Sequence, residues 1–323
     1  MGHTLRILRN AKYLILLTDI VRAADCTVGL SMHERTLADS IRFAGVGLHT
    51  GQPVSMELRP APEGTGIVFR RVDLDDFEIP ADVSSVARVA YATTLMRDGV
   101  WISTVEHVLS ALYGVGVDNA YVDMDNLEVP ILDGSARPFT DAIAEAGLVT
   151  QGRLREYLRI VREFSVNDEE HGKSLSIYPA DAFEIQCAID FEHPFIGPQE
   201  FSLECTGEAY SAAIAPARTF GFQRDVEALE NNGLIRGGSL DNAIVLTATS
   251  MLNKSPLRFK DEFVRHKILD LLGDFALIRR PVLGRLVANR AGHALHTRFV
   301  AGLLESTGHW VVEHAAHSAS VPG

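Results

Sequence analysis

The first part of the chain alternates apolar and polar residues, as the strands of a half-buried sheet do. Val54, Met56 and Leu58 alternate with polar residues, and an apolar run returns at 67–72 after a loop of prolines and glycines. Two such runs separated by turn residues predict a β-hairpin. The stretch GVGLHTG at 45–51 is followed by an alternating strand and not by a helix. This favours a tight turn between two strands over a phosphate-binding loop.

Four segments instead repeat apolar residues with the helical period of about 3.6, which predicts helices that each bury one face. These segments are 103–113, 137–146, 261–278 and 294–305, and Gly114 and Gly147 mark the ends of the first two. Further strands are predicted at 119–124, 183–189 and 282–288. Because both halves of the chain mix strands and helices, the pattern favours an α+β fold over regular βαβ alternation.

At about 150 residues per domain, a chain of 323 residues predicts two domains. Residues 148–157 carry no strong periodicity, so we place the boundary there and expect α+β domains at 32–150 and 151–310, with a tail at 311–323. Residues 1–31 have basic residues before a short apolar patch, but charged residues break the patch and no small-residue cleavage site follows. We therefore expect a disordered extension there rather than a signal peptide.

Composition narrows the class of protein. Lys and Arg number 30 against 42 Asp and Glu, and the net charge of −12 argues against nucleic acid as the main partner, because phosphate binding needs a basic face. Three widely spaced cysteines without a CxxC pair indicate a reducing compartment and argue against disulfides or a cysteine zinc site. No apolar run approaches the roughly 18 residues of a membrane span. The 12 histidines are the more informative count.

The predicted helix at 261–278 carries a polar stripe opposite its apolar face. His266, Asp270 and Asp274 are spaced by four residues, so each step drifts by only about 40° and all three lie on one side. An imidazole and a carboxylate one turn apart can reach the same metal ion. The alternative is a solvated polar face with a helical ion pair, which is the commoner meaning of this spacing.

Three further segments carry candidate chemistry. Ser103 and Glu106 match a capping box at a helix start. The capping box gives no structural role to the neighbouring His107. In the alternative, His107 binds a metal ion and Glu106 holds a water molecule beside it. His293 follows a glycine at a strand end, where it could point into a cleft or lie on the surface as a satisfied histidine. The stretch ARTFGF at 217–222 is a turn of glycine and aromatic residues with a hydroxyl.

Taken together, these segments support a catalytic metal site more strongly than any one of them does alone. Two histidines and one aspartate make a three-ligand set with one coordination position open to water, which is typical of catalytic rather than structural zinc. A nearby carboxylate and a further histidine would supply the two proton transfers of a hydrolysis.

The same segments resemble a known family, the UDP-3-O-acyl-N-acetylglucosamine deacetylases, which are zinc amidohydrolases of lipid A biosynthesis. The matching stretches appear in the family's order and span nearly all of 33–305: GVGLHTG, ISTVEH, ILDGSARPF, ARTFGF, GLIRGGSLDNAIV, FVRHKILDLLGD and GHAL. The combination of HKxLDxxGD with STVEH is highly specific. The resemblance implies two similar α+β domains, each with two helices packed against a β-sheet, and an active site between the domains.

The resemblance also implies a ligand set and two proton-transfer groups. The metal ligands would be His107, His266 and Asp270, and the metal would be Zn²⁺, with Fe²⁺ also able to occupy such a site. Glu106 would be the general base that deprotonates the attacking water. His293 would be the general acid that protonates the leaving amine.

Other residues would support these groups and hold the substrate. Asp274 would orient and charge-stabilise His293, and Lys267 and Thr219 would hold the substrate carbonyl and oxyanion. The resemblance implies that Phe220 is an aromatic residue of the acyl passage. It implies four candidate nucleotide contacts, which are Asp190, Phe191, Glu192 and Lys173.

The implied activity is hydrolysis of the 2-acetamido group of UDP-3-O-(3-hydroxyacyl)-N-acetylglucosamine with release of acetate, the committed step of lipid A biosynthesis. The alternatives are a zinc hydrolase of another acylated amino-sugar and a non-catalytic UDP-lipid-binding protein. The expected partner is the UDP-acyl-amino-sugar substrate, without nucleic acid or stable membrane insertion, and the expected state is a monomer. The expected location is the cytoplasm, with peripheral contact with the inner membrane of a Gram-negative bacterium as an option.

Overall fold

The computed structural model describes residues 31–225 and 234–314. Residues 1–30 of the expected extension and residues 315–323 of the expected tail lie outside the described residues. Residues Met32–Gly323 form one compact unit, distinct from Met1–Ser31. The described helices and strands all belong to this unit.

The first half of the unit is built on a five-stranded sheet with the order β2-β3-β9-β4-β5. Its strands are β2 (Ile41–Val46), β3 (Pro53–Pro60), β4 (Ile67–Arg71), β5 (Phe77–Pro80) and β9 (Ala120–Met124). Val54, Met56 and Leu58 point into the core from β3, which confirms the predicted alternation. Helices α1 (Glu106–Val115) and α2 (Arg137–Ala146) belong to this half.

The predicted hairpin of β3 and β4 is wrong, because β9 lies between them. β9 pairs antiparallel with β3 and parallel with β4. β3 forms its hairpin with β2 instead, through the turn at 45–51, which confirms the turn predicted there. Alternation identifies a strand but does not identify its partner. The sequence of the loop between β3 and β4 does not show that β9, from later in the chain, lies between these strands.

The second half is built on a seven-stranded sheet. Its path is β12-β13-β18-β11-β19, with β14 beside β18 and β15 beside β14. The strands are β11 (Glu156–Ile160), β12 (Phe164–Asp168), β13 (Lys173–Tyr178), β14 (Phe183–Phe191), β15 (Gly197–Glu204), β18 (Val282–Asn289) and β19 (Trp310–His314). Helices α5 (Glu262–Phe275), continued by a 3₁₀ turn at Ala276–Ile278, and α6 (His293–Glu305) belong to this half.

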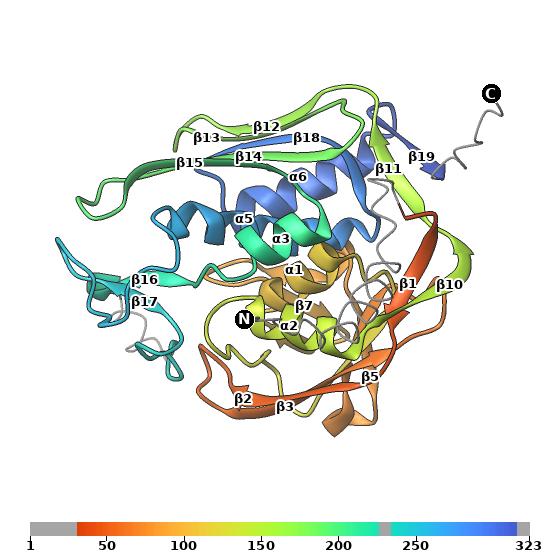
Figure 1. Cartoon of the computed structure of the whole chain (residues 1–323), viewed down its shortest axis with the longest axis horizontal. Helices are drawn as coiled ribbons and strands as arrows, with labels where there is room; N and C mark the ends of the chain where they lie inside the picture. Colours follow the sequence, from red (N-terminus) through yellow and green to blue (C-terminus); the bar gives the residue numbers. More distant parts are fainter. Residues whose placement is uncertain (1–30, 226–233, 315–323) are drawn as a thin grey trace, which may run out of the picture. The chain divides into compact units, whose positions relative to one another are not determined.

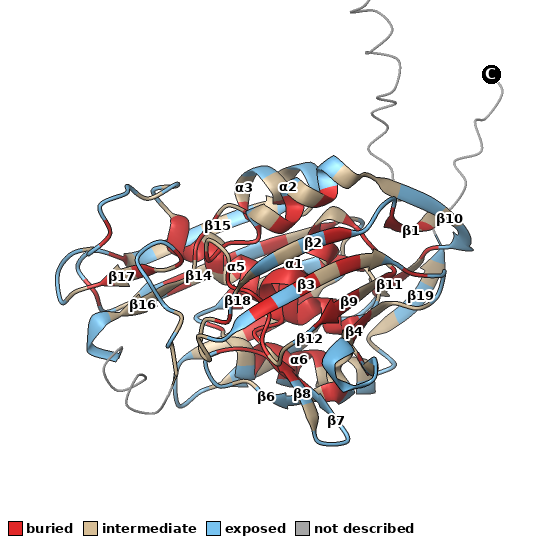
Figure 2. Ribbon diagram, turned by 90° about the horizontal axis from the view of Figure 1, so that it is seen from below, coloured by how far each residue is buried: buried red, intermediate tan, exposed pale blue. Residues whose placement is uncertain are grey.

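The helices form a layer between the two sheets, with α3 (Gly207–Ala213) beside α1 and α5 (Figure 1). α1 of the first half packs directly against α5 of the second. Buried residues concentrate around these two helices (Figure 2). This arrangement confirms the α+β fold expected from the sequence.

The expected boundary segment at 148–157 consists mainly of strand. β10 (Leu148–Leu154) pairs antiparallel with β1 (His33–Leu37), and β11 enters the second sheet directly afterwards. Most residues of β10 are exposed, so main-chain hydrogen bonds hold it without an apolar pattern that the sequence could reveal. Residues 311–314 of the expected tail pair with β11 as part of β19.

Smaller elements complete the fold. β6 (Val86–Arg88), β7 (Thr94–Arg97) and β8 (Val100–Ser103) form a three-stranded sheet, and β16 (Phe220–Phe222) pairs parallel with β17 (Ile244–Leu246). Short 3₁₀ turns lie at Val72–Leu74 and Val83–Ser85. None of the helices within the described ranges is long and apolar enough to cross a membrane.

The start of α1 differs from the predicted capping box. Ser103 ends β8, and the helix begins only at Glu106, with no side chain capping it. Thr104, between the strand and the helix, has a left-handed backbone with φ 59°. The helix also runs one residue past Gly114 to Val115, and Gly116 (φ 76°) caps its end. The Glu106 carboxylate is therefore not a helix cap.

Candidate active site

Helices α1 and α5 approach closely at the start of α1. Gly273 of α5 lies against the backbone of Glu106, where a Cβ at position 273 would overlap the Glu106 carbonyl oxygen. Only glycine allows this approach. The contact brings side chains of α1 and α5 together although more than 150 residues separate them along the chain.

One cluster at this contact offers three metal-binding atoms. His107 of α1 and His266 and Asp270 of α5 are buried and have donor atoms within 4.8 Å of one another. Nε2 of His266 lies 3.3 Å and Nε2 of His107 lies 3.8 Å from Oδ1 of Asp270. Ligand atoms around a tetrahedral zinc ion with bonds of about 2.0–2.2 Å are about 3.3–3.6 Å apart. The donor spacing therefore fits a single ion of that size.

Burial and charge keep this cluster in the protonation state that binds a metal. Burial, with His266 beside it, lowers the pKa of His107 to about 3, and burial also lowers the pKa of His266. Burial opposes ionisation of Asp270, but His266 and Lys267 outweigh it and hold the pKa of Asp270 well below its usual range. Nδ1 of His266 donates to the Ala217 carbonyl oxygen at 3.1 Å, which leaves the Nε2 lone pair for a metal. Neutral imidazoles and an ionised carboxylate are the forms that metals require.

Lys267 lies at the edge of this cluster. Its Nζ donates to Oδ2 of Asp270 at 2.7 Å, and the side chain is 18% exposed. Burial opposes the charge on the ammonium group, but Asp270 outweighs burial and raises the pKa of Lys267. A cation is thus held beside the carboxylate that faces the two histidines.

Glu106 is a buried carboxylate next to the cluster. It is 3% exposed, and its Oε2 accepts a hydrogen bond from the backbone N–H of Thr93 at 3.0 Å. Burial raises the pKa of Glu106 to about 7, and the charge of His293 opposes this rise. The carboxylate is therefore poised to gain or lose a proton near neutral pH.

A second group of side chains surrounds the carboxylate of Asp274, which is fully buried. Nδ1 of His293 and Nδ1 of His296 both donate to Oδ2, at 2.7 and 2.8 Å, and the Thr93 hydroxyl donates to Oδ1 at 2.6 Å. Burial opposes the charge on His293, but Asp274 outweighs it and raises the pKa of His293 to about 9. Burial also opposes ionisation of Asp274, but His293 and His296 lower its pKa to about 2. The result is a buried imidazolium–carboxylate pair.

An apolar cavity of about 520 Å³ opens beside the cluster. Phe220 and Thr219 form part of its wall, and the Phe220 ring meets the His266 ring with centroids 6.2 Å apart. The backbone N–H of Thr219 donates to the Gly134 carbonyl oxygen at 2.8 Å, which fixes this wall to the first half of the chain. The cavity also takes in residues of the 45–51 turn.

The candidate nucleotide contacts belong to the strands β14 and β13 and the residue after β14. Phe191 ends β14 and packs edge-on against Phe220, with ring centroids 5.5 Å apart. Asp190 and Glu192, on either side of it, are exposed. Lys173 begins β13 at the end of the sheet where β18 leads towards α6. The structure therefore gathers the predicted metal-ligating and proton-transfer residues, whereas Lys173 lies on a different strand from the other three candidate nucleotide contacts.

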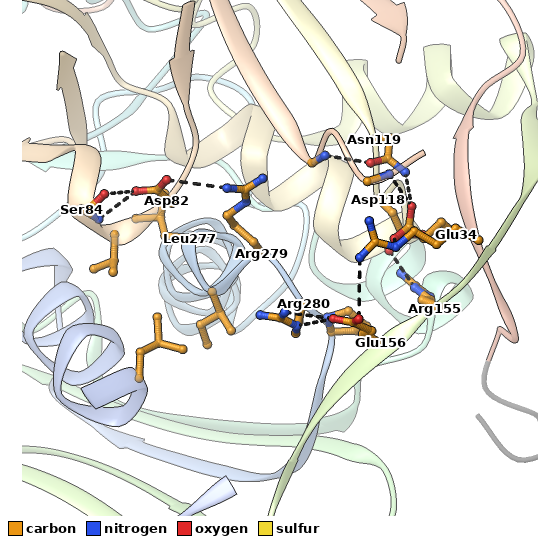
Figure 3. Close-up of a pocket in the computed structure, with 17 residues that line it drawn as sticks. Glu34, Asp82, Ser84, Asp118, Asn119, Arg155, Glu156, Leu277, Arg279 and Arg280 are labelled. Atoms are coloured by element: carbon orange, nitrogen blue, oxygen red, sulfur yellow. Dashed lines mark hydrogen bonds and ion pairs between the residues drawn. The ribbon is translucent and has the colours of Figure 1, made fainter. Parts of the chain in front are cut away.

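A second cavity, of about 490 Å³, contains none of the predicted site residues (Figure 3). Arginines and carboxylates face one another across it. Arg155 pairs with Asp118 at 2.7 Å, and Arg280 pairs with Glu156 at 2.9 Å. This cavity is a polar joint between the two halves of the chain.

Two residues of the site escaped the sequence analysis. His296 follows His293 by three residues, so both lie on one face of α6, and this spacing was the available signal. Thr93 precedes β7 and bonds both Glu106 and Asp274. No pattern in the sequence marks Thr93, because its role depends on its distance from residues far along the chain.

Comparisons with known proteins agree with this geometry. The family model described as UDP-3-O-acyl N-acetylglycosamine deacetylase matches residues 34–305. Over 271 residues the chain is 51% identical to the UDP-3-O-acyl-N-acetylglucosamine deacetylase of Solibacter usitatus (strain Ellin6076), which covers 84% of this chain and 91% of that relative. The protein of the same name from Myxococcus xanthus (strain DK1622) is 51% identical over 84% of this chain and 86% of that relative. The one from Hahella chejuensis (strain KCTC 2396) is 44% identical over 86% of this chain and 93% of that relative. The resemblance predicted from the motifs is thus confirmed, and the chain belongs to the UDP-3-O-acyl-N-acetylglucosamine deacetylases, a family of metal-dependent hydrolases of lipid A biosynthesis.

Proposed function

We propose that the chain hydrolyses the 2-acetamido group of UDP-3-O-(3-hydroxyacyl)-N-acetylglucosamine and releases acetate. Membership of the family supports this reaction. The observation that carries the assignment is the cluster of His107, His266 and Asp270, with the buried Glu106 and His293 nearby. Hydrolysis of an amide needs a base for the water and an acid for the poor leaving group, and this site offers one of each.

In this proposal His107, His266 and Asp270 hold one divalent metal ion, which when bound supplies a Lewis acid for the amide carbonyl and lowers the pKa of a water molecule. Two imidazole nitrogens and one carboxylate oxygen suit Zn²⁺, and Fe²⁺ is the second candidate. We also propose that 32–150 and 151–310 act as two domains with the site between them. In support, α1 of the first half and α5 of the second both contribute to the cluster.

Glu106 takes a proton from the attacking water, and His293 gives one to the leaving amine. A carboxylate with a pKa near 7 is a stronger base than an ordinary glutamate and still ionises at neutral pH. Nδ1 of His293 is engaged by Asp274, so Nε2–H is the proton that His293 can donate. A pKa near 9 keeps this ring cationic at neutral pH, as a general acid requires.

Lys267 and Thr219 stabilise the negative charge that develops on the substrate carbonyl oxygen. The Lys267 ammonium lies beside Asp270, and Thr219 lies on the cavity wall that runs past His266. Donors that are in place before the reaction stabilise a developing oxyanion without reorganisation.

The apolar cavity accommodates the acyl chain, with Phe220 on its wall. We assign the nucleotide to the neighbourhood of Phe191, Asp190 and Glu192, with Lys173 at the sheet end near α6. The chain would work as a monomer in the cytoplasm.

Metal analysis combined with an acetate-release assay on the UDP-acyl-sugar substrate tests the proposal. We expect about one tightly bound metal ion per chain, loss of activity on chelation, and recovery when Zn²⁺ is restored. A chain that binds the ion but releases no acetate from this substrate would contradict the substrate assignment and leave a hydrolase of another acylated amino-sugar.

A further inference from the structure

A buried glutamate outside the metal cluster holds the segment that leads into α1. Glu128 follows β9 and is 2% exposed. Its Oε1 accepts hydrogen bonds from the backbone N–H of His49 at 2.8 Å and the hydroxyl of Thr104 at 2.9 Å. Its Oε2 accepts from the backbone N–H and the hydroxyl of Thr50, at 2.8 and 2.7 Å. One carboxylate thus joins two segments more than 50 residues apart.

Thr104 is the point at which this carboxylate acts on the chain. It is 3% exposed and has φ 59°, a left-handed conformation that a β-branched residue adopts only where its surroundings impose it. The residue before Thr104, Ser103, forms backbone hydrogen bonds with the two neighbours of Glu128. Ser103 N–H donates to Leu127 O at 2.8 Å, and Val129 N–H donates to Ser103 O at 3.1 Å. Val105 N–H donates to Thr93 O at 3.3 Å on the other side of the turn. Between these backbone contacts, the Thr104 hydroxyl ties the turn to Glu128.

The turn at Thr104 sets the direction in which α1 begins. Glu106 and His107 are the first two residues of α1, two and three positions after it. No side chain caps this helix start. A change in φ at Thr104 would therefore swing both residues relative to α5, which carries the other two metal-binding side chains.

One of the other two partners of Glu128 belongs to the wall of the apolar cavity. His49 and the neighbouring Leu48 line this cavity. Gly47 packs so closely that a Cβ there would overlap Oε2 of Glu128. The same carboxylate therefore fixes the cavity wall relative to the start of α1.

We propose that Glu128 is a positioning residue: it holds Thr104 in the left-handed conformation and so presents Glu106 and His107 to the metal ion and the attacking water. The inference rests on the proposed function for the roles of those two residues. Glutamine at 128 cannot replace the carboxylate. Whichever way its amide is turned, the NH₂ group faces a backbone N–H, from His49 or from Thr50, and a backbone donor cannot reverse its role.

The test compares the full-length Glu128→Gln chain with wild type by three measurements. These are the Zn²⁺ dissociation constant by competition with a chelator, kcat and KM for acetate release at saturating Zn²⁺, and amide hydrogen exchange at 103–107 in the metal-free protein. Loss of a group that orients a ligand typically costs 10–100-fold in metal affinity or activity. We expect a loss of that size in zinc affinity or kcat, with faster exchange at 103–107. Adding Thr104→Gly should recover several-fold, because glycine adopts φ 59° without strain.

Glu34→Gln is the matched control. Glu34 is 9% exposed and accepts hydrogen bonds from Gly64 N–H and Asn119 Nδ2, each at 2.8 Å, in the polar joint of Figure 3. This variant should lower thermal stability but leave zinc affinity and kcat unchanged.

Wild-type zinc affinity, kcat and exchange in folded Glu128→Gln would overturn the inference. If that variant fails to fold, Thr104→Val removes only the hydroxyl, and unchanged zinc affinity and kcat there would overturn the inference equally. A wild-type chain that releases no acetate would refute the proposed function, while zinc affinity and exchange would still decide the role of Glu128.

Discussion

Replacing Asp274 with asparagine removes the charge on which His293 depends and nearly preserves the shape of the side chain. The carboxylate accepts hydrogen bonds from His293, His296 and Thr93 at 2.6–2.8 Å, and it is fully buried. An asparagine amide has one accepting oxygen, and its NH₂ group faces a donor on the other side. The variant therefore tests both the charge and the orientation of His293.

The loss of rate follows from the protonation state of His293. Asp274 raises the pKa of His293 to about 9 against the opposing effect of burial, so without this charge the pKa falls towards the ordinary 6.5. At pH 7.5 a histidine of pKa 6.5 is cationic in only about one molecule in eleven. We therefore expect kcat/KM to fall by up to ~10-fold through the change in protonation, and by about 10²–10⁴-fold where acid catalysis is lost altogether.

The assay is the pH profile of kcat/KM for acetate release, measured with metal content determined in parallel. In wild type the basic limb should lie near pH 9, and in Asp274→Asn it should move down from there towards pH 6.5. Metal content should not change, because Asp274 is outside the three-donor cluster. An unchanged basic limb, or a deficit that disappears when metal is restored, would refute the role given to the pair.

The same pair makes the stability of the metal-free protein depend on pH. The folded pKa of His293 is raised to about 9, so its contribution is fully present below about pH 6.5 and is lost as the pH rises through 9. The folded pKa of Asp274 is lowered to about 2, so its contribution is present above about pH 3.8 and is lost as the pH falls through 2. Urea denaturation should therefore show the largest stability gap between wild type and Asp274→Asn at pH 4–6.5 and a smaller gap at pH 10.

Three other outcomes check separate parts of the account. His107→Ala should lose stoichiometric zinc and activity but remain folded by circular dichroism, and a variant that still binds one tight zinc ion would remove His107 from the ligand set. An acyl chain shorter by four methylenes, at about 0.8 kcal/mol each, should lower kcat/KM by roughly two orders of magnitude, whereas equal rates would show that the cavity does not hold the chain. Asp118→Asn leaves Arg155 buried without its charge partner in the polar joint of Figure 3. It should lower the free energy of unfolding by about 3 kcal/mol and leave kcat per folded molecule unchanged. A Tm equal to that of wild type would contradict this.

The sequence by itself determined the local elements. The alternation at Val54, Met56 and Leu58 predicted β3, and the apolar period at 137–146 predicted α2 with its stop at Gly147. The spacing of four that places His266 and Asp270 on one side of α5 is also local, because it depends only on the helical repeat. These features need no knowledge of the rest of the chain.

Only the tertiary structure decided which elements meet. The insertion of β9 between β3 and β4, and the pairing of the exposed β10 with β1, depend on main-chain hydrogen bonds between distant segments, which leave no pattern in either segment. The contact of α1 with α5 brought His107 to within 4 Å of Asp270. It also buried the Glu106 carboxylate, for which the sequence left a helix-capping role open, and so raised its pKa to about 7. Periodicity shows which face of a helix or strand is apolar. The burial and pKa of a side chain and the geometry of a metal site depend instead on distances between elements, and these distances are set only when the chain packs.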